Sequence, residues 1–242
     1  AQESRGLGDV YKRQLTRSSL YLRIEETGMD GEDWEKLWRE VKAAQHQKGY
    51  QQAYRSMEAA ARDTEGEMLF YRSKVCEGVF HRISSGATRD GLEVFGKMEK
   101  GYLLSVDSNW DMYGEGYLSG HYFSEEALRK QLEKAYPGLV FTEESPEKQI
   151  NMYKRDKVGH ILSLTVGNKT ISGEEFRKLL ELPSSNFTMQ AADGKIRFLC
   201  KGQGHGLGLS QYGGNVLAKE GKSYREILRY YFPECEVKKE DS

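Results

Sequence analysis

The sequence predicts an α+β fold organised as a single domain, with a helical N-terminal third followed by antiparallel strands, a glycine-rich loop and two C-terminal helices. Three observations support this class. Apolar residues recur at helical spacing early in the chain, strand-like segments begin after residue 66, and the two kinds of segment are segregated rather than strictly alternating. With 242 residues, the chain is long enough to bury a core without disulfides or a metal.

The first third of the chain is expected to be helical. Residues 15–27 end at a glycine, and the apolar residues of segment 34–41 recur at the spacing of one helical face. The alanine-rich segment 51–64 stops just before Gly66, since glycine commonly follows the end of a helix.

Strands are expected in the rest of the chain. Segments 67–71 and 74–81 are short and suit a strand pair, and residues 160–166 alternate as in a half-buried strand. The Asp193-Gly194 pair lies between two further strand candidates and predicts a tight hairpin.

Four more helices are predicted from their start and stop signals. Ser124 caps a helix that runs to Tyr136 and is stopped by proline and glycine. Capping boxes at 172–175 and 223–226 open two others, the first ending near residue 182. The remaining helix, over residues 209–220, follows the glycine-rich loop directly.

Composition excludes several classes of protein. The 36 basic and 37 acidic residues leave a net charge of −1, so there is no electrostatic case for nucleic-acid binding. No apolar run approaches the length of a transmembrane helix. Cys76, Cys200 and Cys235 are scattered and form no CxxC pair, which indicates buried small hydrophobes rather than a disulfide framework or a zinc knuckle.

The N-terminal residues 1–14 are set apart from the fold. They resemble a translated sequencing linker, the alternative being a frayed basic terminus, and we expect this segment to be non-native or disordered. Because the sequence has no initiator methionine or signal peptide, we expect a fragment whose true start is missing. Residues 15–242 would then form one partial domain.

The glycine-rich segment 201–214 is the most informative part of the sequence. Glycine occupies every second position from 202 to 208, allowing backbone angles closed to other residues, and His205 lies between two of these glycines. The N–H groups at the start of the following helix would attract an anion or a polar oxygen. Neither the dinucleotide fingerprint G-x-G-x-x-G nor the hydrolase elbow G-x-S-x-G fits the spacing.

This segment resembles the signature of the stage II sporulation protein D family. Residues 202–213 read Gly-Gln-Gly-His-Gly-Leu-Gly-Leu-Ser-Gln-Tyr-Gly, and the likeness continues through 218–221 and 223–232. Upstream, segments 64–69 and 80–89 and the helix and strand of 171–187 are also similar to the family. The resemblance spans residues 42 to 233 and extends more weakly back to Leu15.

The resemblance implies a lytic transglycosylase that cleaves peptidoglycan glycan strands, or an enhancer of cell-wall amidases. In the first case a glutamate acts as general acid and base, and the muramic 6-hydroxyl replaces water as nucleophile. The family's glutamate segment is not found in this sequence, so we expect it upstream of Leu15 and assign no catalytic residue. The implied location is the outer side of the cytoplasmic membrane, with any anchor in the missing N-terminal part.

Some members of the family carry a zinc cluster of cysteine and histidine. Here the matching segment has Cys76 and His81, but Ser84 and Ser85 stand where sulfur ligands are needed. Two candidate ligands do not make a closed tetrahedral site. We therefore predict no metal and no other cofactor.

The candidate glycan-binding residues come from two polar segments that follow strand candidates. They are His81, Ser84, Ser85, Thr88, Arg89, Gln203, His205, Ser210, Gln211 and Tyr212. We expect both segments to share one face, which would bring the two histidines together. Structural alternatives remain open: a polar turn with Thr88 as a helix cap, a core position for Tyr212, and polar side chains that only satisfy loop backbone. His46, His121 and His160 show no partner pattern.

The sequence thus predicts a protein that acts on, or binds, bacterial cell-wall glycan. Its expected partners are peptidoglycan strands and an amidase that removes their stem peptides, without nucleic acid. The leading hypothesis is a fragment of a lytic transglycosylase that lacks the catalytic glutamate, and the second is a non-catalytic amidase-enhancer module. A third, a phosphate or nucleotide binder, would need a cationic contact, for which Lys201 is the nearby candidate.

Overall fold

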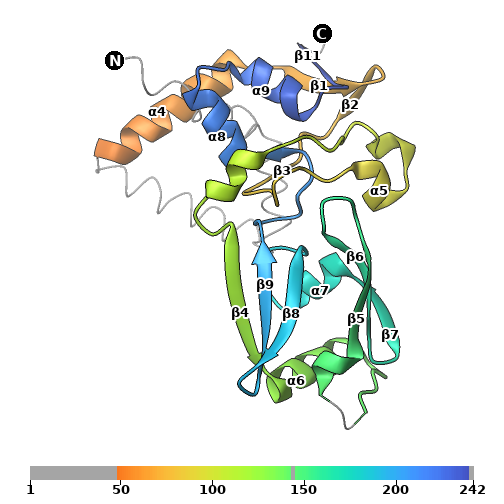
Figure 1. Ribbon diagram of the computed structural model, residues 1–242. Helices are drawn as coiled ribbons and strands as arrows, with labels where there is room; N and C mark the ends of the chain where they lie inside the picture. The colour runs from red at the N-terminus through yellow and green to blue at the C-terminus, as the bar shows by residue number, and fades with distance from the viewer. Residues whose placement is uncertain (1–47, 143–144, 240–242) are drawn as a thin grey trace. The chain divides into compact units, whose positions relative to one another are not determined.

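A computed structural model describes residues 48–142 and 145–239 of the chain (Figure 1). The terminus 1–14 and the helices predicted over 15–27 and 34–41 lie outside the described residues. The helices and antiparallel sheets of the described part confirm the α+β class.

The described part of the chain forms two compact units. Unit 1 combines the described residues up to Gly78 with those from Gly214 onward, and unit 2 is the continuous stretch Val79–Gly213. The predicted domain of residues 15–242 stays a prediction, because its first residues are outside the described part.

Unit 1 contains a three-stranded antiparallel sheet in which β1 (Glu67–Tyr71) is the central strand. It pairs with β2 (Lys74–Cys76) on one side and with β11 (Glu236–Lys239) on the other. The predicted strand pair is therefore confirmed as far as Cys76. Beyond it, β3 (Phe80–His81) pairs with a different strand in unit 2.

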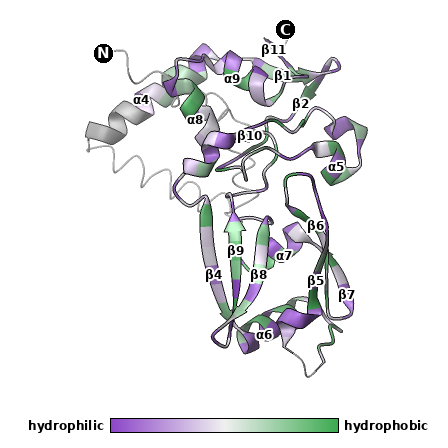
Figure 2. Ribbon diagram, in the orientation of Figure 1, coloured by the Kyte–Doolittle hydropathy of each residue, from purple (hydrophilic) through white to green (hydrophobic). Residues whose placement is uncertain are grey.

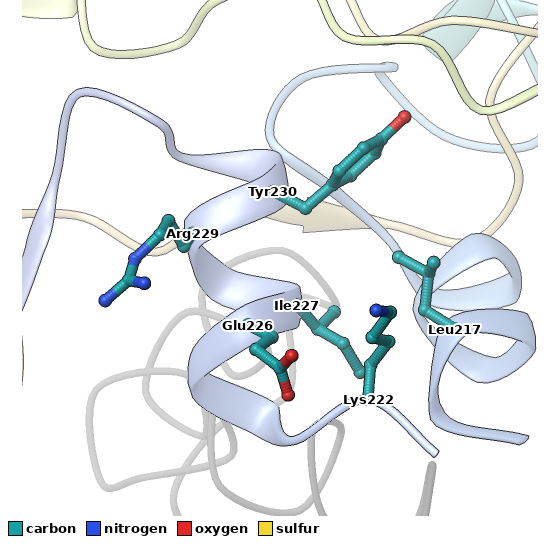
Figure 3. Close-up of a pocket in the computed structure, with 6 residues that line it drawn as sticks. All are labelled: Leu217, Lys222, Glu226, Ile227, Arg229 and Tyr230. Atoms are coloured by element: carbon teal, nitrogen blue, oxygen red, sulfur yellow. The ribbon is translucent and has the colours of Figure 1, made fainter. Parts of the chain in front are cut away.

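Two helices of unit 1 accompany this sheet, α4 (Lys48–Asp63) and α9 (Tyr224–Tyr231), and α8 (Gln211–Lys219) begins in unit 2 and continues into unit 1. The predicted capping box opens α9, with reciprocal hydrogen bonds between Ser223 and Glu226. A cavity of about 310 Å³ lies beside α8 and α9 and is lined by Leu217, Lys222, Glu226, Ile227, Arg229 and Tyr230 (Figure 3).

Unit 2 contains two three-stranded antiparallel sheets and two main helices. The bounds are β4 (Leu118–Ser124), β5 (Ile150–Arg155), β6 (Ile161–Val166), β7 (Lys169–Ser172), β8 (Phe187–Ala192), β9 (Lys195–Lys201), α6 (Glu125–Ala135) and α7 (Gly173–Leu179). One sheet has the order β4-β9-β8 and the other β5-β6-β7. The predicted hairpin at Asp193-Gly194 joins β8 to β9.

One hydrophobic core joins both sheets of unit 2 to α6 and α7. Phe176 of α7 stacks on Phe187, and both rings contact Phe198 of β9. Figure 2 shows the apolar residues along β5, β6 and β9 that contribute to this core. The core holds the ends of β6 and β9 in place, and the candidate site lies next to those ends.

Short elements complete unit 2: α5 (Gly91–Phe95), β10 (Leu209–Ser210), and the 3-10 turns η2 (Met98–Lys100), η3 (Asn109–Tyr113) and η4 (Pro146–Gln149). The structure corrects the suggested helix cap at Thr88, because the N-cap of α5 is Asp90, whose side chain accepts from the Glu93 N–H. No helix in the described ranges is long and apolar enough to cross a membrane.

Candidate functional site

Two polar loops of unit 2 run side by side: the first loop, residues 80–89, and the glycine loop, residues 201–213. Strand β3 pairs in parallel with β10, with His81 opposite Ser210. Further along, bridges join Ile83 to Gln203 and Arg89 to Leu207. The loops are therefore linked through their backbones over most of their length.

The glycines of the glycine loop are required both by backbone conformation and by close packing. Gly202, Gly204, Gly206 and Gly208 have φ values of 78°, 105°, 76° and 66°, a region that favours glycine. A Cβ on Gly204 would lie 2.8 Å from the His81 Cβ, too close for any other residue without a shift. The glycine pattern seen in the sequence thus reflects a loop pressed against its neighbour.

The two loops bring His81 and His205 together, as predicted. Their ring centroids are 5.9 Å apart, with the planes tilted by 60°. His81 is buried with 3% exposure, whereas His205 is only half-buried. One imidazole thus lies behind the other.

The backbone of Leu207 orients both rings. Its carbonyl oxygen lies 3.0 Å from His81 Nδ1, and its N–H donates to His205 Nδ1 over 3.1 Å. A carbonyl only accepts and an N–H only donates, so in the neutral rings His81 carries its proton on Nδ1 and His205 on Nε2. His81 Nε2 is then a hydrogen-bond acceptor, and His205 Nε2 is a donor.

His81 is neutral at physiological pH. Burial lowers its pKa to about 4, the hydrogen bond to the Leu207 carbonyl opposes this change, and the charge of Arg89 lowers the pKa further. Its buried Nε2 has no hydrogen-bond partner among the described residues. An unpartnered buried acceptor is costly, and a polar ligand group would satisfy it.

Arg89 is a fully buried cation that holds the glycine loop. Its Nε donates to Asp156 over 2.6 Å, and its Nη1 donates to Glu174 over 3.2 Å. Nη1 also donates to the backbone carbonyl of His205 over 3.1 Å. Because its side chain is only 1% exposed, the geometry supports a positioning role for Arg89. Its predicted contact with glycan stays a prediction.

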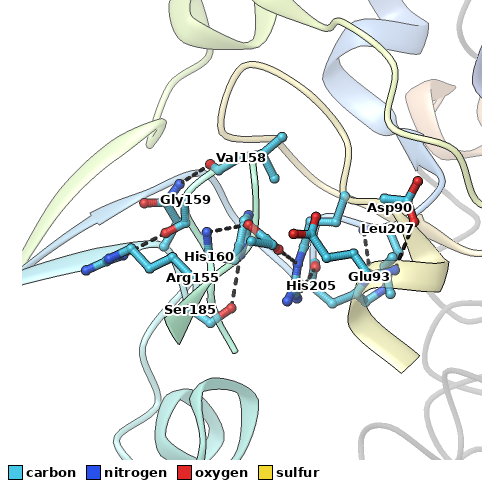
Figure 4. A network of polar contacts seen from close by, with 12 residues as sticks. Asp90, Glu93, Arg155, Val158, Gly159, His160, Ser185, His205 and Leu207 are labelled. Atoms are coloured by element: carbon cyan, nitrogen blue, oxygen red, sulfur yellow. Dashed lines mark hydrogen bonds and ion pairs between the residues drawn. The ribbon is translucent and has the colours of Figure 1, made fainter. Parts of the chain in front are cut away.

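His160 belongs to the same polar network, although the sequence suggested no partner for it. It is 1% exposed, and its Nδ1 lies 3.0 Å from Ser185 Oγ (Figure 4). Its Nε2 lies 3.4 Å from Ser85 Oγ. Burial and then the charge of Arg89 lower its pKa well below the usual value. The His160 ring is therefore neutral, and it belongs to the buried polar network that packs against the two loops.

Three other predicted residues are buried and bonded within the protein. The Ser84 N–H donates to Asp111 over 2.7 Å, and Ser84 Oγ accepts from the Gly86 N–H. Ser210 Oγ accepts from the Gly213 N–H at the start of α8. Thr88 Oγ1 donates to the Leu104 carbonyl and accepts from the Val106 N–H. These two hydrogen bonds join the first loop to the segment that contains Leu104 and Val106. Their predicted binding role is untested, but their side chains shape the loops.

The remaining predicted residues are half-buried: Ser85, Gln203, Gln211 and Tyr212. Gln203 Nε2 donates to the Gly116 carbonyl over 3.0 Å. The Tyr212 N–H donates to the Arg82 carbonyl, which fixes the backbone of this residue beside the first loop. These side chains and His205 are the predicted site residues that a ligand can approach most directly.

Sequence reasoning missed the acidic residues of the network. Asp156 pairs with Arg89, Glu174 accepts from Arg89 and from Ser185, and Asp111 accepts from Ser84. Burial raises the pKa of Asp111. Asp111 lies 27 positions from Ser84, and Asp156 and Glu174 lie 67 and 85 positions from Arg89, so sequence spacing gave no signal for these contacts.

No group of three or more histidine, cysteine, aspartate or glutamate side chains that could hold a metal ion occurs in residues 48–142 and 145–239. The prediction of no metal and no cofactor therefore stays a prediction for the whole chain.

Comparison with known proteins points to one family. No protein-family model matches the chain. The chain is 30% identical over 193 residues to the stage II sporulation protein D of Bacillus amyloliquefaciens, and 27% identical over 194 residues to that of Bacillus subtilis strain 168. Each match covers 80% of this chain and 54% of the relative, so the chain spans about half the length of these relatives.

A shorter similarity connects the chain to a second protein of Bacillus subtilis strain 168, named amidase enhancer. It is 42% identical over 50 residues, 21% of this chain and 7% of that protein. The two longer matches cover four-fifths of the sequence and agree with the resemblance found from its glycine loop, so this chain belongs to the stage II sporulation protein D family.

Proposed function

We propose that this chain binds glycan strands of peptidoglycan through the first loop and the glycine loop, as part of a lytic transglycosylase of the stage II sporulation protein D type. The names of its relatives support a sporulation-related function at the cell wall. In this proposal the protein works on the outer side of the cytoplasmic membrane, where the glycan lies.

The observation that carries the proposal is the complementary histidine pair. His81 offers an unpartnered acceptor at Nε2, and the neighbouring His205 offers a donor at Nε2. A sugar hydroxyl both donates and accepts, and an N-acetyl group carries one donor and one acceptor. In this proposal, one such group of the glycan enters beside His205 and pairs with the buried acceptor of His81.

Neighbouring residues of unit 2 hold His81 and His205 in the orientation that the proposal requires. Arg89 holds the His205 carbonyl, and Leu207 orients both rings, so little freedom is lost when a ligand binds. The half-buried Tyr212 lies on the same loop and would add an aromatic surface for a sugar ring.

Strand cleavage requires a general acid in addition to binding. Asp111 has a raised pKa, but its side chain is fully buried and accepts from the Ser84 N–H, so it cannot reach a glycosidic oxygen. The proposal therefore assigns binding to the two loops and proton transfer to the glutamate that the family resemblance implies.

Binding can be tested by co-sedimentation with peptide-stripped peptidoglycan. We expect the chain to sediment with the glycan and His205→Ala to weaken the affinity about fivefold to thirtyfold, since a hydrogen bond to a sugar contributes about 1–2 kcal/mol. His121→Ala is the matched control, because His121 is also half-buried but lies on β4. Equal losses in both variants, or no binding by the unmodified chain, would contradict the proposal.

The similarity to the amidase enhancer favours a second candidate, a module that stimulates a cell-wall amidase without cleaving glycan. The two candidates predict different soluble products. A transglycosylase releases anhydro-muramic fragments from peptide-stripped peptidoglycan, whereas an enhancer releases none but increases stem-peptide release when an amidase acts on intact peptidoglycan. Mass spectrometry of both reactions distinguishes them.

A further inference from the structure

Two cysteines of unit 1 lie in direct contact although they are far apart in the sequence. The sulfur atoms of Cys76 and Cys235 are 3.5 Å apart, and the residues are separated by 159 positions. Cys76 ends β2 and is half-buried, and Cys235 is buried just before β11 begins. Sequence spacing alone predicted isolated cysteines.

The backbones around both cysteines are held by the sheet of unit 1. Leu69 of the central strand pairs with Cys76 on one side and with Val237 on the other. The Cys235 N–H donates to the Phe232 carbonyl over 3.0 Å. A disulfide bond is about 2.0 Å long, so a closer approach of roughly 1.5 Å by side-chain rotation would join the two sulfur atoms.

We propose that Cys76 and Cys235 form a disulfide bond that closes unit 1. This inference does not depend on the proposed glycan binding, because neither cysteine belongs to the two loops of the candidate site.

The bond forms by thiol–disulfide exchange with a small oxidised disulfide such as oxidised glutathione. The thiolate of Cys76, the more exposed of the two, attacks one sulfur, forms a mixed disulfide and releases one glutathione thiolate. The thiolate of Cys235 then attacks the Cys76 sulfur and releases the second glutathione. Both cysteines lose a proton and are oxidised, and one oxidised glutathione is reduced to two thiols.

The order of these steps follows from the environment of Cys235. Its hydrogen bond with Cys76 and then its burial raise the pKa of its thiol, which disfavours its thiolate in the reduced protein. Once Cys76 is capped by the mixed disulfide, the thiol–thiol hydrogen bond is lost. Cys235 is then freer to ionise and complete the exchange.

Such a bond would have a large effect because unit 1 is discontinuous in sequence. Its two parts are joined only through the whole of Val79–Gly213, so the cross-link closes a loop that contains unit 2. A cross-link that closes a long loop removes more freedom from the unfolded chain than one that closes a short loop.

Cys200 provides an internal control. It is fully buried in β9, within the core of unit 2, and burial raises the pKa of its thiol to about 11. It belongs to a different unit from the other two cysteines. We expect it to stay reduced under conditions that oxidise the other two.

The test is peptide mapping of the folded chain after equilibration with oxidised glutathione. Trypsin places the three cysteines in separate peptides, covering residues 75–82, 198–201 and 230–238. We expect peptides 75–82 and 230–238 to be joined and two hydrogens lighter than their sum, with 198–201 free. Three free thiols, a persistent glutathione adduct on Cys76, or a cross-link to Cys200 would overturn the proposal.

Thermal unfolding gives a second readout. Oxidation should raise the melting temperature of the unmodified chain by roughly 5–10 °C and should leave Cys76→Ser unchanged. The melting temperature of Cys200→Ala should still rise on oxidation. A bond that forms without stabilising the unmodified chain would contradict its closing role in unit 1.

Discussion

The first loop and the glycine loop have similar compositions but do different things in the structure. Both follow strands, and each carries one histidine among small and polar residues. In the first loop, Ser84, Thr88 and Arg89 are buried and bonded to other parts of unit 2. In the glycine loop, left-handed glycines bring the backbone close and leave Gln203 and His205 half-buried. The buried side chains of the first loop thus hold the two loops in position, whereas the glycine loop leaves side chains partly exposed to solvent.

Among the substitutions that test this comparison, removal of Arg89 should have the largest effect on the free energy of unfolding. Arg89→Met leaves Asp156 buried without its counter-charge, so the free energy of unfolding should fall by about 3–5 kcal/mol. Arg82→Met is the control, because Arg82 is an exposed residue of the same loop and should change stability by less than about 0.5 kcal/mol. Urea unfolding at neutral pH measures both. Equal effects would show that burial and charge pairing do not set Arg89 apart from an exposed arginine of the same loop.

The buried histidine of the first loop should make stability depend on pH. The folded-state pKa of His81 is about 4 against 6.5 in the unfolded chain, so the unfolded state binds more protons between these values. The stability contributed by neutral His81 is complete above about pH 6.5 and is lost progressively down to about pH 4, by roughly 3 kcal/mol. His160 acts in the same direction.

Substitution of His81 tests this pH dependence. Urea unfolding of His81→Gln at several pH values should show a smaller loss of stability on acidification than the unmodified chain. A profile with the same slope in both proteins would show that His81 is not the source.

Close packing of the glycine loop should appear as a difference between two alanine substitutions. Gly204→Ala and Gly194→Ala both place alanine at positive φ, at a cost of about 1–2 kcal/mol each. Only at Gly204 would the new Cβ meet His81, whereas nothing lies within 4 Å at Gly194. Gly204→Ala should therefore lower the unfolding free energy by about 1 kcal/mol more. Identical values would show that the two loops are not tightly packed.

The smallest effect on stability is expected for the presented histidine. His205→Ala should change the free energy of unfolding by less than about 1 kcal/mol, because the ring is half-buried. The same variant should lose glycan in the sedimentation assay. A large loss of stability would place His205 among the positioning residues instead.

Local features of the fold were predictable from the sequence. The capping boxes at Ser172 and Ser223 and the Asp193-Gly194 hairpin depend on residues within a few positions of each other. The alternate glycines likewise predicted left-handed backbone in the glycine loop. The approach of His81 to His205 followed from placing both polar segments on one face.

Features that depend on distant partners were missed. Strand β3 was expected to continue the pairing of β2, but it pairs with β10, more than a hundred residues away. The sequence placed His160 in a strand and Glu174 at the start of a helix. In the structure His160 forms a hydrogen bond with Ser185, and Glu174 accepts one from Arg89. Sequence pattern reports which face of an element is apolar, but it does not say which polar groups are buried together.

The discontinuity of unit 1 also affects how the chain can fold as it is synthesised. The central strand β1 is made before any residue of unit 2, but its partner β11 is made only after all of unit 2. Unit 2 is continuous, so all its residues leave the ribosome before β11 does. Until then β1 has one unpaired edge, with Leu69 and Phe70 beside it. A chain that ended before Glu236 would keep every residue of unit 2 and leave that edge open.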